Sequence, residues 1–328
     1  MKIGQILDLI DLGSMALPEF QRGYVWNREQ VRGLMHSLYR KHPVGSLLVW
    51  VTRTEQATAR GPEGLAPGYV KLLLDGQQRV TSLYGIIRGN PPAFFEGNAK
   101  AFTGLHFSLE DETFEFYAPM KMKDNPHWIS VTELMKAGVG QFIGKVYANP
   151  DLRDGLEKYI ARLNAIDSIK EIDLHVEEVT GEGKNVDVVV DIFNRVNSGG
   201  TKLSKGDLAL AKVCAQWPEA RAALNKRLAK WQRAGFKFKL EWLLRCINAM
   251  VTGEALFTAL EGVTTAEVQD GLGIAEDAID TLLNTVSSRL GLDHDRVLGS
   301  RYSFPLMARY LAQRGRRLPD HGERDRLL

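Results

Sequence analysis

The sequence has few cysteines and no long apolar segment. Only 2 of its 328 residues are Cys, and Cys214 and Cys246 each lie in an apolar stretch typical of a helix. Two separated thiols without a CxxC pair argue against a disulfide framework and against a zinc site, and they fit a reducing compartment. No apolar run approaches the ~20 residues of a membrane-spanning helix, and the first residues lack a signal-peptide core. We therefore expect a cytoplasmic protein without a membrane partner.

Several catalytic motifs are absent as well. The sequence contains no GxxxxGKS or GxxxxGKT loop of the Walker type, no GxSxG or HExxH motif, no kinase signature and no convincing histidine-rich nuclease cluster. Its net charge of +2 neither requires nor excludes nucleic acid, so a basic surface would have to be local. With 328 residues, 44% of them hydrophobic and 25% charged, the chain is typical of a globular protein of about two domains.

The most informative pattern is a strand followed directly by a helix. The mostly apolar residues 70–74 predict a short buried strand. Asp75-Gly76 then favours a tight turn, and the apolar residues that follow recur at helical spacing. The five polar residues 75–79 (DGQQR) therefore lie where a strand ends and a helix begins. A second strand is predicted at residues 46–51, which are too apolar for an exposed sheet edge.

Two interpretations of this polar turn stay open. The amides in the first turn of a helix lack intrahelical partners and attract anions, and Arg79 adds a planar fork that suits phosphate. In the alternative, the turn is only a capped strand end in which Arg79 pairs with Asp75. Two glutamines beside an arginine favour the first interpretation, because stopping a strand does not require such polar density.

A second polar cluster follows a helix that is predicted to begin at Asn185. Asn194, Arg195 and Asn197 come just before a Gly-Gly pair, which supplies a left-handed C-cap. They form either an ordinary polar helix end, with Arg near the negative pole of the helix dipole, or a second polar wall of the pocket that begins at Asp75.

Two further patterns also have a structural and a functional interpretation. Asp173, His175 and Glu177 share one face of a strand predicted at 171–179, so a metal site has to be considered. The solvent side of a half-buried strand explains the same alternation. The basic residues of the segment 226–239 are interleaved with aromatic residues, which suits a nucleic-acid backbone. A solvated helix face with buried rings is the simpler explanation.

The remaining predictions concern secondary structure. A capping box at Asn27 and Gln30 opens a helix, a hairpin is expected over 105–117, and helices are expected over 130–168 and after residue 218.

Three segments, in this order, resemble one known family. They are residues 20–26 (FQRGYVW), 74–79 (LDGQQR) and 193–201 (FNRVNSGGT). Together they resemble the DGQQR-motif domain at the N-terminus of Gmr-type modification-dependent restriction enzymes and related phage-defence proteins. The likeness is strong over about residues 17–88 and 186–213.

The resemblance implies a fold and a domain organisation. The family is similar to the ParB/sulfiredoxin fold, so we expect an α+β protein with a ParB/sulfiredoxin-like nucleotide-binding core followed by a mainly helical region. We place the core with the DGQQR motif at residues 1–125. The helical region, with one strand at 171–179 and the FNRVNSGGT motif, is placed at 126–328. Members of the family often carry a further C-terminal nuclease domain of the His-Asn-His type; the chain ends before one, so we do not expect it to cut both DNA strands alone.

The resemblance also implies roles for individual residues. Arg79 and Arg22 would clamp phosphate oxygens, Asp75 would bind Mg²⁺ or orient water, and Gln77 and Gln78 would position the attacking water or the triphosphate. The expected sets are the catalytic residues Asp75, Gln77, Gln78 and Arg79; the nucleotide-binding residues Gln21, Arg22, Gly76, Thr81, Asn194, Arg195, Asn197, Ser198 and Gly199; the DNA-binding residues Tyr24, Trp26, Lys226, Arg227, Lys230 and Arg233; and Asp75 as the metal ligand.

The implied function is NTP binding and hydrolysis in the restriction of modified foreign DNA. The first hypothesis is a metal-dependent NTPase that uses GTP, CTP, UTP or ATP with Mg²⁺, with DNA nicking as a further expected activity. The second is a non-catalytic module that senses nucleotide or DNA and regulates an attached nuclease domain. The third is a toxin-like or adaptor protein that binds nucleic acid through its basic helices. The expected partners are modified foreign DNA, a nucleoside triphosphate and a second copy of the chain in a homodimer.

Overall fold

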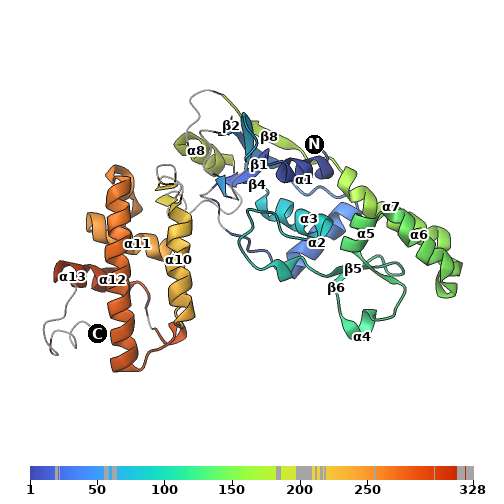
Figure 1. The fold of residues 1–328 in the computed structure, drawn as a ribbon. Helices are drawn as coiled ribbons and strands as arrows, with labels where there is room; N and C mark the ends of the chain where they lie inside the picture. Colours follow the sequence, from blue (N-terminus) through green and yellow to red (C-terminus); the bar gives the residue numbers. More distant parts are fainter. Residues whose placement is uncertain are drawn as a thin grey trace. The chain divides into compact units, whose positions relative to one another are not determined.

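The chain forms two compact units, Met1–Lys184 and Asn185–Leu328 (Figure 1). The computed structural model describes residues 1–18, 21, 23–54, 59–60, 65–181, 186–196, 209–210, 213–214, 217, 219–254, 256–298, 300–315 and 322. The first unit extends beyond the predicted boundary at residue 125, because the helices that follow pack onto the elements before them. This combination of helices with small sheets agrees with the predicted α+β class.

A mixed five-stranded sheet forms one layer of the first unit. Its strands run in the order β3-β1-β4-β2-β8, with bounds Ala59–Arg60 for β3, Met15–Pro18 for β1, Tyr69–Asp75 for β4, Leu47–Arg53 for β2 and Val176–Val179 for β8. β4 is parallel to β1 and antiparallel to β2, and β2 is parallel to β8. Both strands predicted from apolar runs are therefore inner strands, which explains why residues 47–50 are buried without alternation.

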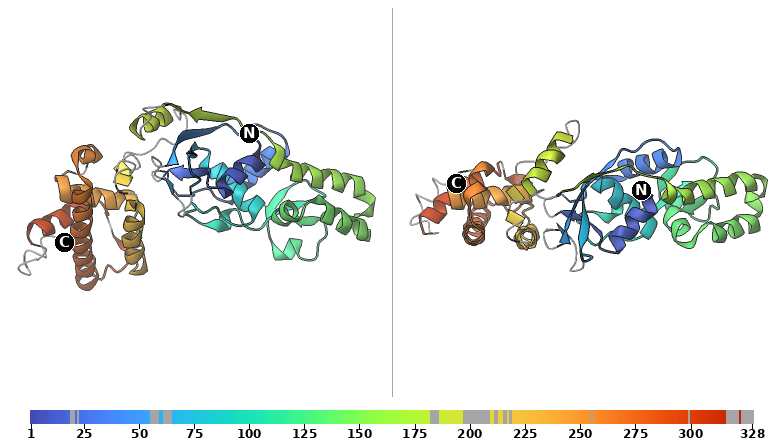
Figure 2. Two further views of the ribbon diagram at one scale, coloured as in Figure 1. Left: turned by 45° about the horizontal axis from the view of Figure 1, so that its top comes forward. Right: turned by 90° about the horizontal axis from the view of Figure 1, so that it is seen from above.

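Three helices cover one face of this sheet. They are α1 (Ile3–Asp11), α2 (Arg28–Tyr39) and α3 (Gln77–Arg88). α2 begins with the predicted capping box between Asn27 and Gln30. Leu47, Val49 and Leu73 of the sheet share one hydrophobic core with these helices. Because α3 also packs against α5 on its far side, it is buried around most of its circumference (Figure 2).

The rest of the first unit is a small antiparallel sheet with helices. The sheet has the order β6-β5-β7. The element bounds are Ala99–Ala101 for η2, Leu105–Ser108 for β5, Phe114–Phe116 for β6, Pro119–Met122 for α4, Trp128–Ser130 for β7, Val131–Ala137 for α5, Val139–Ala148 for α6, Pro150–Gly155 for η3 and Leu156–Asp167 for α7. The predicted hairpin and the predicted helices over 130–168 are thus confirmed.

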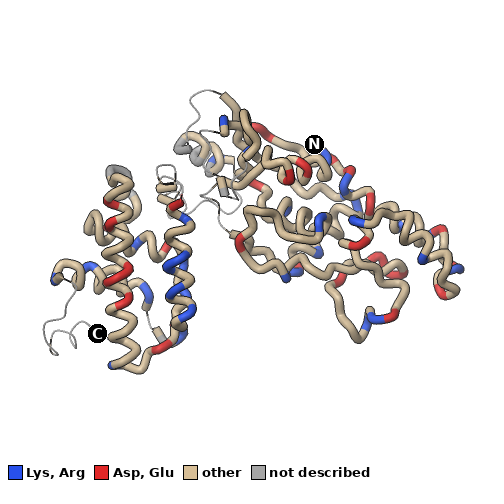
Figure 3. The backbone as a smooth tube through the Cα atoms, viewed as in Figure 1, with Lys and Arg blue, Asp and Glu red and all other residues tan. Residues whose placement is uncertain are grey.

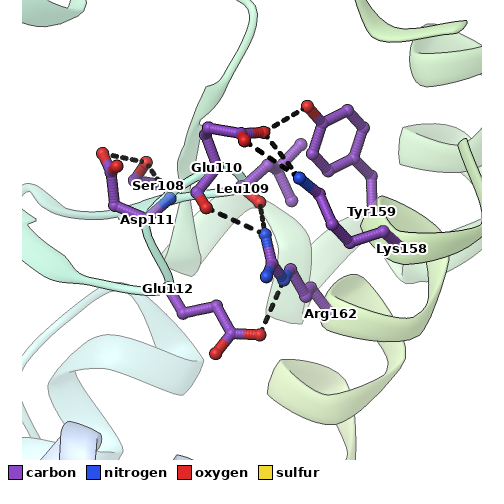
Figure 4. A network of polar contacts seen from close by, with 8 residues as sticks. All are labelled: Ser108, Leu109, Glu110, Asp111, Glu112, Lys158, Tyr159 and Arg162. Carbon is purple, nitrogen blue, oxygen red and sulfur yellow. Dashed lines mark hydrogen bonds and ion pairs between the residues drawn. The ribbon is translucent and has the colours of Figure 1, made fainter. Parts of the chain in front are cut away.

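Helix α7 fastens the turn of the β5–β6 hairpin (Figure 4). Arg162 Nε donates to Glu112 at 2.7 Å, and its Nη1 donates to the carbonyls of Leu109 and Glu110. Lys158 Nζ donates to both carboxylate oxygens of Glu110 at 2.9 Å. These contacts join residues about 50 positions apart, so the hairpin and α7 are parts of one folded unit.

The strand predicted at 171–179 is shorter than expected. A 3₁₀ turn, η4 (Ser168–Glu171), takes its first position. Next, the carbonyl of Ile172 accepts the N–H of Ile3 at 3.0 Å, so this segment pairs with the N-terminal residues. It joins the sheet only from Val176 onwards, where β8 runs beside β2.

The described part of the second unit consists of helices. Their bounds are Val186–Val196 for α8, Ala220–Arg233 for α10, Leu240–Thr252 for α11, Phe257–Gly262 for η5, Thr265–Leu290 for α12, Asp295–Val297 for η6 and Ser303–Gln313 for α13. A separate core holds α10 to α13 together, with Phe238 stacked on Trp242 at 3.9 Å between ring centroids. Within the described residues, none of the helices combines the length and the hydropathy that crossing a lipid bilayer would require.

Candidate functional site

The predicted strand–turn–helix is present. β4 ends at Asp75, and α3 begins at Gln77. Gly76 between them has φ +92°, in the left-handed region. A Cβ atom at this position would lie 2.2 Å from Cδ2 of Leu47, the first residue of β2. Position 76 therefore requires glycine for both its backbone conformation and its packing.

Arg79 holds this turn against the loop that precedes β2. Its Nη1 donates to the carbonyl of Val44 at 2.6 Å, and its Nη2 donates to the carbonyl of Ser46 at 2.7 Å and to Asp75 Oδ2 at 3.0 Å. Gly45 makes this approach possible, because a Cβ there would lie 2.8 Å from Nη1. This is the ion pair of the structural alternative, extended by two backbone carbonyls. A contact of Arg79 with phosphate stays a prediction.

The two charges of this pair differ in their access to solvent. The side chain of Arg79 is 14% exposed, whereas that of Asp75 is 42% exposed. Burial lowers the pKa of Arg79, and the nearby Asp75 opposes this effect. Oδ1 of Asp75 has no hydrogen bond within the described part of the chain. The site therefore presents a carboxylate to solvent while its guanidinium is held beneath.

The FQRGYVW segment lies directly beside the turn. Gln78 Oε1 accepts the N–H groups of Val25 and Trp26 at 2.9 and 3.2 Å, and its Nε2 donates to the carbonyl of Gly23 at 3.3 Å. The buried Gln21 donates from Nε2 to the carbonyl of Leu74 at 2.7 Å. The structure thus brings two of the three motifs together, and both glutamine amides bind backbone groups.

Tyr24 belongs to the core. It is 7% exposed, and its ring contacts Phe95 and Phe102. Its hydroxyl lies 2.7 Å from that of Ser82 on α3, and burial raises its pKa to about 12. A DNA contact by Tyr24 would require its release from this packing. The half-buried Trp26 lies at the margin of the same core.

Two other predicted site residues are buried in α3. Gln77 is 7% exposed and Thr81 is 1% exposed. The hydroxyl of Thr81 is the buried side-chain oxygen that lacks a hydrogen-bond partner among the described residues. An unpaired buried hydroxyl is costly. Its predicted role in nucleotide binding stays a prediction.

Part of the predicted site lies outside the described residues. This applies to Arg22, Asn197, Ser198 and Gly199, and to the side chain of Asn194. Arg195 is exposed on α8 of the second unit. The roles of these residues stay predictions.

A magnesium ion at this turn would have Asp75 as its single carboxylate ligand from the described residues. Among the described residues, no group of three or more His, Cys, Asp or Glu side chains could hold a metal ion. Mg²⁺ bound with a nucleotide needs only one or two carboxylates, because water and phosphate oxygens complete its shell. The exposed Asp75 satisfies this requirement. His175 pairs instead with Glu177, at 2.7 Å from Nε2 to Oε1, which agrees with the solvent-side interpretation of that strand.

The predicted DNA-binding helix is α10, along which several Lys and Arg residues lie (Figure 3). Their contacts divide these basic residues into two groups. Arg227 and Lys230 bind acidic residues of α12: Glu276 accepts from both at 2.9 and 2.7 Å, and Asp280 accepts from Lys230 at 2.6 Å. Lys226 and Arg233 are exposed. The neighbouring ring of Trp231 is buried and also donates to Asp280. Arg227 and Lys230 therefore hold two helices together, which the sequence did not predict. The buried ring of Trp231 and the exposed Lys226 and Arg233 agree with the predicted solvated helix face with buried rings.

Acidification should weaken this contact between α10 and α12. Burial acts to raise the pKa of Glu276, but the hydrogen bonds from Lys230 and Arg227 outweigh it and hold the pKa below its usual value. Because the folded pKa is lower than the unfolded value of about 4.3, the stabilisation is fully present above that pH and is lost as the pH falls through the folded pKa. We expect Glu276→Gln to lower the free energy of unfolding by about 1 kcal/mol at neutral pH and the difference to disappear in acid.

Urea unfolding at a series of pH values measures this effect. Asp270→Asn, an exposed acid on the same helix, is the control and should leave the pH dependence unchanged. Equal pH profiles for the two variants would show that the Glu276 contacts add nothing to stability.

The loop at 44–46 is the part of the site that sequence reasoning missed. Val44 and Ser46 act through their carbonyls, and a carbonyl leaves no signature in a sequence. Gly45, with φ +84°, was the one detectable signal, since a glycine before a strand can mark a close approach of another group.

Comparison with known proteins supports the family resemblance. Residues 3–214 match the family model described as GmrSD restriction endonuclease, N-terminal domain. A protein of Methanocaldococcus jannaschii described as uncharacterized protein MJ0686 is 38% identical over a stretch that covers 26% of this chain and 17% of that protein. The chain therefore spans less than a fifth of the curated relative that it matches. The prediction from the three motifs is confirmed: the chain belongs to the family of GmrSD restriction endonuclease N-terminal domains.

Proposed function

We propose that the first unit binds and hydrolyses a nucleoside triphosphate during the restriction of foreign DNA. One observation carries this proposal. The FQRGYVW and DGQQR segments contact each other beside the solvent-exposed carboxylate of Asp75, where α3 begins. The first-turn amides of α3 lie next to that carboxylate, and such amides attract phosphate. A ParB/sulfiredoxin-like core is part of the same proposal.

Asp75 is the residue that we propose to act on the nucleotide. Its Oδ2 is fixed by Arg79, and its Oδ1 can bind a Mg²⁺–nucleotide or orient the attacking water. The metal, when bound, neutralises charge on the phosphate oxygens. Because Arg79 holds one of its oxygens, the carboxylate is already oriented before the nucleotide enters.

Arg79 and Gln78 support this site mainly as positioning residues. Both Nη atoms of Arg79 and both polar atoms of the Gln78 amide contact neighbouring groups of the protein. The resemblance implies a direct phosphate contact for Arg79. We propose instead that Arg79 holds Asp75 and the 44–46 loop in position. A nucleotide contact by Arg22 is part of the same proposal.

The same contacts favour a second candidate function, a nucleotide- or DNA-sensing module without turnover. The side-chain donors of Gln78 and Arg79 bind groups of the protein itself. They are therefore poorly placed to stabilise charge that develops in a transition state. Such a module would bind NTP or modified DNA and regulate an attached nuclease domain. In both cases DNA is the proposed partner, with the exposed Lys226 and Arg233 as candidate contacts.

Phosphate release separates the two functions. The chain is incubated with Mg²⁺ and GTP, CTP, UTP or ATP, with and without modified DNA, and nucleotide binding is measured in parallel. Release of phosphate above the background without protein supports the enzyme. Binding without release supports the sensing module, and the absence of both contradicts a nucleotide function for this turn.

A further inference from the structure

A cavity of about 330 Å³ lies in the first unit, lined by residues that the DGQQR site does not use. It is enclosed by the small sheet, by α5 and α6, and by the start of η3. Its volume is within the range of small-molecule sites, near the lower end.

The cavity has an apolar floor, half-buried walls and a charged rim. Ile129, Phe142, Val146 and Leu152 are buried and form the floor. The walls combine the rings of His106 and Trp128 with the side chains of Ser130 and Asn149, which are all half-buried. Glu133 and Lys145 are exposed at the rim. An apolar base with a few polar groups around it is the usual composition of a ligand pocket.

The walls can bind a flat ring. Trp128 already has Lys121 Nζ at 4.8 Å from its ring centroid, and His106 lies 5.1 Å from Tyr117 between ring centroids. These contacts hold both rings in place before a ligand arrives, so stacking on them costs little side-chain entropy. His106 Nδ1 lies 3.1 Å from the carbonyl of Gly104, which requires the proton on Nδ1 and leaves Nε2 of the neutral ring as an acceptor.

The polar groups suit an anion on one side and an amine on the other. Lys145 lies with Nζ 4.8 Å from the ring centroid of Phe142, and no ion pair involving it is found among the described residues. Asn149 uses Oδ1 to cap η3, so its amide nitrogen remains a donor. Ser130 accepts the N–H of Glu133 and can still donate its own proton. Lys145 and Asn149, at the end of α6, match phosphate oxygens, whereas the Glu133 carboxylate and His106 Nε2, which lie beside Ser130, accept from an exocyclic amine.

We propose that this cavity is a second ligand site, which binds a nucleoside monophosphate. The base stacks between the walls, and the phosphate pairs with Lys145 at the rim. This proposal does not depend on NTP hydrolysis at Asp75, because the cavity shares no residue with the DGQQR turn.

Calorimetric titration of the full chain with AMP, CMP, GMP and UMP tests the proposal. At least one of them should bind with a dissociation constant below about 1 mM. The matching nucleoside and inorganic phosphate should each bind at least about 10-fold more weakly than that nucleotide, because each lacks half of the recognised groups. The variant Lys145→Met keeps the stem over Phe142 but removes the charge, and it should weaken binding about 10-fold. Lys136→Met, an exposed lysine of α5 outside the cavity, is the matched control and should bind as the original chain does.

Three results would overturn the proposal. The first is that none of the four nucleotides binds. The second is equal binding by Lys145→Met and Lys136→Met, or binding of inorganic phosphate as tight as that of the nucleotides. The third is binding that is lost in Asp75→Asn but kept in Lys145→Met, because that would place the nucleotide at the DGQQR turn. Both lysines are exposed, so neither variant should fail to fold.

Discussion

Replacing Asp75 by asparagine should lower NTP turnover by at least about 100-fold, the scale on which removal of one charge-stabilising group acts. The side chain is 42% exposed and holds one carboxylate oxygen away from Arg79, so it is the charged group of the turn most accessible to Mg²⁺ or water. The substitution removes the negative charge that both roles require. Phosphate release with Mg²⁺ and the preferred nucleotide measures the effect.

Asparagine is chosen because it keeps the local structure. Its amide oxygen can still accept from Arg79 Nη2, so the guanidinium keeps its three partners. A loss of activity in this variant then reports on chemistry rather than on folding, which its urea midpoint confirms.

Asp11→Asn is the matched control. Asp11 accepts from Tyr84 and Arg88, at the opposite end of α3. Loss of this ion pair should leave turnover unchanged, because it lies a helix length from the turn. Equal turnover in Asp75→Asn and the original chain would exclude Asp75 from the reaction and would leave the sensing function as the better proposal.

Replacing Arg79 by methionine should lower the free energy of unfolding by about 2–3 kcal/mol, because three hydrogen bonds from a charged donor are lost at once. The guanidinium is 14% exposed and satisfies two carbonyls and one carboxylate. Methionine has a similar stem but no donor, so the carbonyls of Val44 and Ser46 would lose their partner. Urea unfolding measures the change.

Arg88→Met provides the comparison on the same helix. Arg88 pairs with Asp8 and Asp11, but it is 32% exposed and binds no backbone carbonyl among the described residues. We expect this variant to lose at most about 1 kcal/mol, as for other surface ion pairs. Similar losses in both variants would contradict the central position that the structure gives to Arg79.

The local features of the site could be predicted from the sequence. A run of apolar residues followed by Asp75-Gly76 gave the strand, the turn and the helix in the right places. Asn27 and Gln30 gave the start of α2. These features depend on backbone preferences and on spacing along one segment, which a sequence displays directly.

Long-range pairing could not be predicted in the same way. No pattern shows that Gln78 binds the backbone of residues 23–26, or that β2 lies between β4 and β8. Tyr24 illustrates the difficulty, because an aromatic residue in an irregular segment can lie on a surface or in a core. Its partners, Ser82 and Phe102, are more than 50 positions away. The choice therefore depended on tertiary contacts.

The hydrogen bonds between α7 and the β5–β6 hairpin limit how far the chain can be shortened. A fragment ending at residue 125 would remove Arg162, so the carbonyl of Leu109 would lose this donor and Glu112 would lose one of its two arginine partners. It would also remove β8 and turn β2 into an open sheet edge, ready to associate with other chains. A fragment ending at residue 184 keeps both Arg162 and β8, so it is better suited to expression and crystallisation than one ending at residue 125.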